Sequence, residues 1–303
     1  MFAMKLVATS AASFAGAVAL AAFAVAGREI KRSGQGVLDL EASIDSLRVV
    51  ATGAMPAVGY STGRSNVITD FNEDLDLPVI DGGAYVDPLA SVIGAVRIGR
   101  QVYVAPFASI RGDEGQPIYI ADGANVQDGV VVHALETHQE GLPVSGRTYR
   151  VGNRDYAVYV GRRVSLAHQA LVHGPALIED NVFVGMQAMV FKASVGEGVV
   201  IEPGAKVIGV SIPAHRYVPA GQTITDQKVA DKLPTITDSY AFRSLNDAVV
   251  HVNTSFANAY REAAAERADS AAAAEQARAH GPAPEPSSHA KPEKKEEKKS
   301  EGH

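Results

Sequence analysis

Aliphatic residues recur at every sixth position through the middle of the chain, and this repeat limits its fold more than any other feature. The series is Val86, Val92, Ile98, Val104, Ile110, Ile120, Val126, Val132, Val160, Leu166, Val172, Ile178, Val184, Val190, Val195, Ile201 and Val207, with short breaks. A helix would need apolar residues three and four apart, and a flat strand would need alternation. A spacing of six predicts a triangular coil with one short strand per face, an aliphatic residue inside and Gly or Asn at the corners. The sequence therefore predicts an all-β solenoid, a left-handed parallel β-helix of hexapeptide repeats with a C-terminal α-helix.

The flanks of the repeat divide the chain into further segments. We expect a signal peptide over 1–26, a linker over 27–64, the β-helix over 65–220, a C-terminal helical segment over 221–279 and a disordered Lys/Glu tail over 280–303. The repeat is interrupted once, and the polar insert at 134–156 is expected to form a loop at the active site.

The N-terminal segment has the character of an export signal. Lys5 precedes an uncharged stretch, and Ala24-Val25-Ala26 offers a cleavage site. The uncharged stretch is close to the ~20 residues that span a bilayer, so an uncleaved anchor is the alternative. In both cases we expect the folded part to be exported, periplasmic or extracellular.

Composition excludes two classes of site. A net charge of −6 argues against a nucleic-acid partner, which needs a basic face. The chain has no cysteine, so it has neither a disulfide framework nor a thiolate metal site. Any transition metal must therefore be held by imidazole and carboxylate groups.

Three histidines occupy informative positions in the repeat. His133 and His173 each follow an interior valine by one residue and share one slot, whereas His168 follows Leu166 by two and lies on the preceding face. Within one coil His168 and His173 therefore point outward from different faces. A single ion bound by both residues needs a second chain. Three coils around a threefold axis would supply it, and three imidazoles with an open position are typical of catalytic zinc. The alternative for each histidine is an ordinary surface or hydrogen-bonding role.

Charged residues lie near these histidines in the repeat. Glu114 and Glu136 are expected near the metal, where a carboxylate can accept a proton from bound water. Arg111 and Asp113 are expected to form an ion pair that holds neighbouring chains together. Gln127 lies one coil before His133, with a turn-stabilising amide as its alternative role.

Four segments together resemble the gamma class of carbonic anhydrases over roughly 65–260. They are RGDEG at 111–115, NVQDGVVVHALET at 125–137, SLAHQALVHGP at 165–175 and VGMQAM at 184–189. The resemblance implies a homotrimer with a metal at each interface, zinc with Fe(II) or Co as alternatives, held by His133, His168 and His173. It implies reversible hydration of CO2 to bicarbonate and a proton by a metal-bound hydroxide.

The same resemblance assigns roles to single residues. Glu136 is implied as the proton shuttle, Glu114 and Gln127 as the pair that positions bicarbonate and bound water, and Arg111 as a contact to bicarbonate and to Asp113 across the interface. Asn253 is similar to a helix asparagine that helps to position CO2. Two residues depart from the family: Gly112 replaces a serine, which we expect to be harmless, and His251 replaces a tyrosine near the active site.

Two other functions fit the same coil. A hexapeptide-repeat acyltransferase would use one histidine as a general base and would need neither three matched histidines nor an Arg-x-Asp-Glu run. A non-catalytic scaffold related to gamma carbonic anhydrase would not need the two shuttle carboxylates, and the presence of Glu114 and Glu136 favours an enzyme.

Overall fold

The computed structural model describes residues 63–279. The expected signal peptide at 1–26, most of the linker and the expected tail at 280–303 lie outside the described residues. In the part of the chain that is described, no helix combines the length and the apolar character needed to cross a bilayer.

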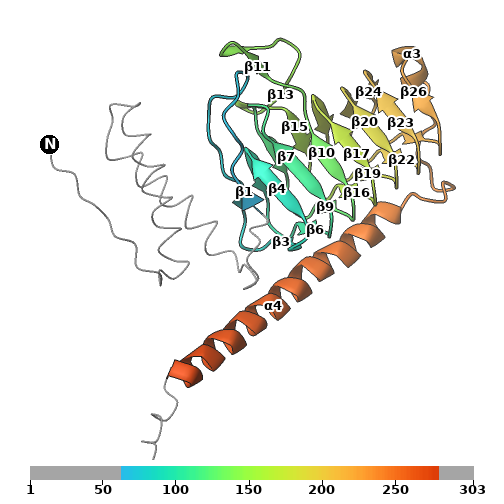
Figure 1. The fold of residues 1–303 in the computed structure, drawn as a ribbon. Coiled ribbons are helices and arrows are strands. Elements are labelled where there is room, and N and C mark those ends of the chain that lie inside the picture. The colour runs from blue at the N-terminus through green and yellow to red at the C-terminus, as the bar shows by residue number, and fades with distance from the viewer. Residues whose placement is uncertain (1–62, 280–303) are drawn as a thin grey trace, which may run out of the picture.

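Three parallel sheets form the walls of a left-handed β-helix (Figure 1). Sheet A contains β1 (Gly63–Arg64), β4 (Ser91–Gly94), β7 (Ser109–Gly112), β10 (Val131–His133), β17 (Leu171–His173), β20 (Met189–Phe191), β23 (Lys206–Ile208) and β26 (Thr223–Ile224). Sheet B contains β2 (Val79–Ile80), β5 (Val96–Ile98), β8 (Ile118–Ile120), β15 (Val158–Val160), β18 (Ala176–Ile178), β21 (Ser194–Val195) and β24 (Ser211–Ile212). Sheet C contains β3 (Tyr85–Val86), β6 (Tyr103–Val104), β9 (Asn125–Val126), β16 (Ser165–Leu166), β19 (Phe183–Val184), β22 (Val200–Ile201) and β25 (Tyr217–Val218).

The aliphatic series fills the interior of the coil, as the spacing predicts. Every member from Val92 to Val207 is at most 3% exposed, and only the first, Val86, is partly buried. Because alternate side chains of a strand point to opposite faces, the residues beside these aliphatics point outward. The position of each outward residue is therefore fixed by the repeat.

The insert at 134–156 leaves the coil as two short hairpins. The first pairs β11 (His138–Gln139) with β12 (Leu142–Pro143), and the second pairs β13 (Tyr149–Val151) with β14 (Arg154–Tyr156). In Figure 1 they lie on the upper side of the coil, between β10 of sheet A and β15 of sheet B.

The coil continues beyond residue 220, since β26 adds one further strand to sheet A. After it come a short helix, α3 (Gln227–Ala230), and the long helix α4 (Leu245–Ala279). Residues of α4 contact β3, β6, β9 and β16, all of sheet C. The helix then extends past the N-terminal end of the coil (Figure 1), and its residues from 265 to 276 are exposed.

Candidate metal centre

His133 and His173 stand side by side on the outer face of sheet A. They end β10 and β17, which pair in register, so that His133 is opposite His173. Val132 and Val172 occupy the interior at 0% exposure, which turns the next residue of each strand outward. The two imidazole ring centroids are 5.3 Å apart. The structure therefore brings two of the three predicted ligands together within one chain.

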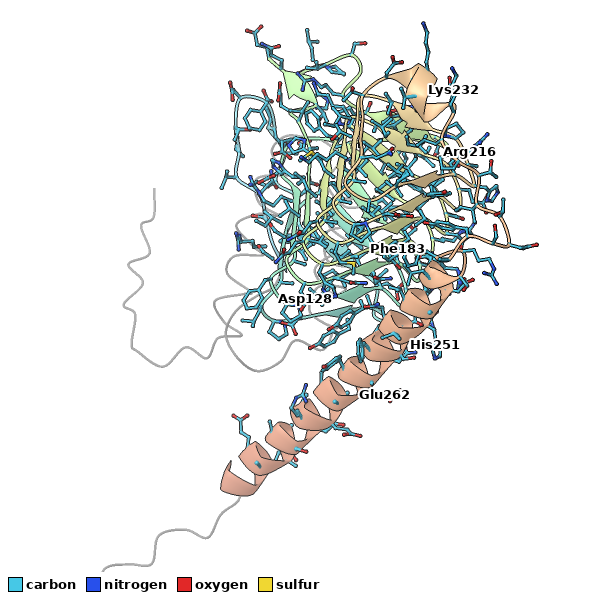
Figure 2. All side chains as sticks on the ribbon, turned by 90° about the vertical axis from the view of Figure 1, so that its right-hand side faces the viewer. Asp128, Phe183, Arg216, Lys232, His251 and Glu262 are labelled. Carbon is cyan, nitrogen blue, oxygen red and sulfur yellow. The ribbon has the colours of Figure 1, made fainter. Side chains whose placement is uncertain are left out.

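His168 lies at the corner between sheets C and A, in the turn from β16 to β17. Its side chain is 56% exposed, and Nδ1 is 3.0 Å from Oδ2 of Asp128. Asp128 holds the same slot one coil earlier, because β9 pairs with β16 and Val126 is opposite Leu166 (Figure 2 labels Asp128). The chain thus presents His168 on an edge of the coil, separate from the outer face that carries His133 and His173.

Two histidines have a neighbouring acceptor at Nδ1, and within residues 63–279 their other ring nitrogen has no partner. Oδ2 of Asp128 lies 3.0 Å from Nδ1 of His168, and the carbonyl oxygen of Gly174 lies 3.2 Å from Nδ1 of His173. A histidine that binds a metal usually donates its second N–H to such an acceptor, which fixes the tautomer and the ring. Burial lowers the pKa of His173, which favours the neutral imidazole that a metal requires.

Two carboxylates complete the surroundings of His133. Oε1 of Glu114 contacts Nε2 of His133, and Oδ1 of Asp113 is 3.4 Å from the same atom. The three ligand atoms lie within 4.8 Å of one another. Burial raises the pKa of Glu114, while the contact with His133 opposes that shift.

The polar atoms of this group fit a bound cation. Oδ1 of Asp113, Oε2 of Glu114 and Nε2 of His133 are buried, and within residues 63–279 none has a hydrogen-bond partner. Buried polar atoms are normally paired, and imidazole with carboxylate is a donor set for divalent transition metals. The residues present therefore fit a metal ion at the outer face of sheet A.

Arg111 lies next to His133 on this face, because β7 pairs with β10. Its guanidinium is 2.9 Å from Oδ2 of Asp113 in the same chain and is 44% exposed. The structure forms this ion pair, which was expected between chains, within one chain. The exposed guanidinium leaves positive charge beside the candidate metal centre.

Gln127 lies in a buried polar chain at the His168 corner. Its amide donates to Asn125, and Asn125 donates to the hydroxyl of Ser165, each at 2.9 Å. Within one chain the structure does not place Gln127 beside Glu114, because the two residues follow strands of different sheets.

Glu136 and Asn253 lie farther along the chain. Oε1 of Glu136 is 3.3 Å from Nη2 of Arg147, on the same loop, and the glutamate side chain is 44% exposed. Asn253 is buried on α4, where its amide donates to the carbonyl oxygen of Val249. His251, labelled in Figure 2, is exposed on the same helix. Because α4 covers sheet C, both helix residues are separate from the histidines of sheet A in their own chain.

Two residues that contact the predicted site residues were not predicted from the sequence, namely Asp128 and Arg147. Asp128 lies in the segment 125–137 and follows Val126 by two, as His168 follows Leu166 by two. Arg147 lies within the polar insert at 134–156. The repeat could have identified Asp128, whereas no spacing rule relates Arg147 to Glu136, because both lie outside the coil.

Comparison with known proteins gives relatives of several kinds. A carbonic anhydrase from Methanosarcina thermophila is 54% identical over 204 residues, which are 67% of this chain and 83% of that protein. Gamma carbonic anhydrase 2 from mitochondria of Arabidopsis thaliana is 32% identical over 146 residues, 48% of this chain and 46% of that protein. The carboxysome assembly protein CcmM of a Nostoc species is 43% identical, over 55% of this chain and 29% of that protein.

Solved structures add a distant likeness. A hexapeptide transferase family protein from Anaplasma phagocytophilum is 21% identical with a TM-score of 0.46, over 61% of this chain and 93% of that one. A likeness at this level bears on neither activity nor substrate. A scan against protein-family models gives no match. With more than half of the aligned residues shared with the archaeal enzyme over most of its length, this chain belongs to the gamma-class carbonic anhydrase family.

Proposed function

We propose that this chain forms a homotrimer that catalyses the reversible hydration of CO2 to bicarbonate and a proton. Each active site would combine His133 and His173 of one chain with His168 of its neighbour. One observation carries the proposal: a pair of histidines meets on one outer face, while the third stands on the adjacent edge, where its Nε2 has no partner among residues 63–279. A cyclic arrangement brings the edge of one copy onto the face of the next and closes after three steps.

Exposed apolar side chains around His168 support an interface there. Met186 occupies the slot of His168 one coil later and is 45% exposed. Leu89 and Phe107, on the same corner of earlier coils, are 61% and 69% exposed. Apolar groups gathered on one edge and rimmed by polar residues are typical of a surface that binds protein. A second copy of this chain is the partner that would also complete the histidine set.

The metal would be held by Nε2 atoms of the three histidines, with zinc as the favoured ion and Fe(II) or Co as alternatives. When bound, such an ion supplies a hydroxide nucleophile from water near neutral pH. The contact of His168 with Asp128 and the hydrogen bond of His173 with Gly174 would keep those two rings oriented for it.

The remaining residues have distinct tasks in this proposal. Arg111 would attract and hold bicarbonate through its exposed guanidinium. Glu114, together with Gln127 of the neighbouring chain, would position the reacting groups. Glu136 would carry the proton from the site to the loop surface, and Asn253 of α4 would help to place CO2. The presence of both Glu114 and Glu136 favours an enzyme over a scaffold.

Metal content and activity test the proposal together. Anaerobically purified protein is expected to contain about one zinc, iron or cobalt per chain and to hydrate CO2. His168→Ala should lose most of its metal and at least ~100-fold in kcat, while His215→Asn, at an exposed corner outside the centre, should retain both. An active wild type without bound metal would contradict the proposal.

A further inference from the structure

His138 lies on the hairpin that follows Glu136 and has no part in the function proposed above. It begins β11, and its imidazole is only partly buried. Nδ1 of His138 is 3.1 Å from the hydroxyl of Thr137, a buried residue. An imidazole exchanges protons with water near neutral pH more readily than any other side chain. Because His138 lies on the active-site loop, its role there depends on which ring nitrogen has a lone pair that can accept a proton.

The hydrogen bonds of Thr137 assign the tautomer of His138. The Thr137 hydroxyl donates its single proton to the carbonyl oxygen of Glu114 at 2.7 Å, and it accepts from the backbone N–H of Gln116 at 2.8 Å. A hydroxyl has one donor and two acceptor lone pairs, so its remaining capacity toward His138 is that of an acceptor. Nδ1 of neutral His138 must then carry the hydrogen, which leaves the lone pair on Nε2.

The backbone around Gly115 packs closely against Thr137 and His138, next to the metal centre. Gly115 has a φ of 106°, and a Cβ there would lie 2.5 Å from the Thr137 hydroxyl and 2.9 Å from Nδ1 of His138. The neighbouring Glu114 contacts His133 with its side chain and binds Thr137 with its carbonyl oxygen. His138 is thus anchored to the same segment that supplies a carboxylate to the metal centre.

We propose that His138 is a second proton relay on the active-site loop, with Nε2 as the accepting atom. This inference rests on the proposed CO2 hydration, which releases one proton per bicarbonate formed. Oε1 of Glu136 is engaged by Arg147, so a second base on the loop would increase the routes for that proton to solvent. The lone pair of Nε2 accepts the proton, giving an imidazolium, and a buffer base then removes it.

NMR of the metal-loaded protein tests the tautomer without reference to turnover. The ¹⁵N shifts of the neutral His138 ring should show a protonated Nδ1 and an unprotonated Nε2. His138→Gln identifies the resonances. A protonated Nε2 in the neutral ring would overturn the assignment and the relay with it.

Kinetics test the relay itself. In weak buffer, His138→Ala should lower kcat by about threefold to tenfold, a small share of what positioned proton transfer contributes. Its kcat/KM for CO2 should be unchanged, and concentrated imidazole buffer should restore kcat. An equal loss in both buffers, or a loss of kcat/KM, would show a structural role only. An unchanged kcat would also end the proposal, whereas a wild type inactive in every buffer would instead refute the proposed function.

Discussion

At the scale of single residues, the contact between Asp128 and His168 is the one most open to test. Nδ1 of His168 lies 3.0 Å from a carboxylate oxygen of the preceding coil, and both side chains are about half exposed. Removal of such a partner typically weakens metal binding about 10- to 100-fold, because the ring loses its orientation and its fixed tautomer. Asp128→Ala should therefore lower metal affinity by that factor in competition with a chelator.

A matched control exists for this substitution. Asp155 forms an exposed ion pair with Arg150 on the second hairpin, outside the candidate metal centre. Asp155→Ala should leave metal affinity unchanged. Equal affinity in wild type and Asp128→Ala would show that Asp128 does not orient His168.

The histidines themselves could be predicted because the repeat fixes which way each one points. Gly112 could not be interpreted in this way. Glycine in place of the family's serine is expected to be harmless, and the structure adds that a Cβ at residue 112 would lie 2.5 Å from the carbonyl oxygen of Ala95. That close approach depends on how two successive coils stack around Gly94 and Gly112, and no spacing of residues in the sequence reveals it.

At the scale of elements, an aromatic cluster joins α4 to sheet C. Tyr103 of β6 packs against Phe256 and Tyr260 of α4, with ring centroids 5.6 and 6.0 Å apart. Tyr85 of β3 stacks on Tyr103 and Tyr260. These contacts fix the first half of α4 on the coil.

This cluster gives the fold a measurable pH dependence. Burial, followed by the charge of nearby groups, raises the pKa of Tyr103 to about 12. An unfolded tyrosine loses its proton near pH ~10, so above that pH the unfolded state binds fewer protons than the folded state. The free energy of unfolding should therefore fall as pH rises from about 10 to 12.

Tyr103→Phe isolates this contribution, since it keeps the ring and removes the titrating hydroxyl. Denaturant unfolding of the variant should show a shallower decline over the same pH range. Tyr149→Phe, on the second hairpin, serves as the control. An identical slope in wild type and Tyr103→Phe would contradict the assignment.

The coil could be predicted from the sequence, whereas the hairpins of the insert and the start of α4 could not. Sixfold spacing identifies the interior residues because a narrow prism has room for one aliphatic side chain per strand. The hairpins of the insert follow no repeat, and the start of α4 at Leu245 depends on packing of residues such as Tyr240, which donates to Glu202 at 2.7 Å. Such long-range contacts are not encoded in local periodicity.

At the scale of the whole molecule, the central claim is that each metal site belongs to two chains. Two inactive variants can test it when they are combined. His168→Ala chains still offer His133 and His173, and His173→Ala chains still offer His168. Trimers that form at random from equal amounts of the two variants have three interfaces each. In about one quarter of these interfaces, His133 and His173 of a His168→Ala chain face His168 of a His173→Ala chain.

The decisive measurement is CO2 hydration by co-expressed His168→Ala and His173→Ala chains carrying different tags, with mixed trimers verified by native mass spectrometry. Each variant alone should be inactive, and the mixture should recover up to about one quarter of the wild-type rate. No recovery in verified mixed trimers would contradict the shared site, because a site contained within one chain cannot be restored by a neighbour.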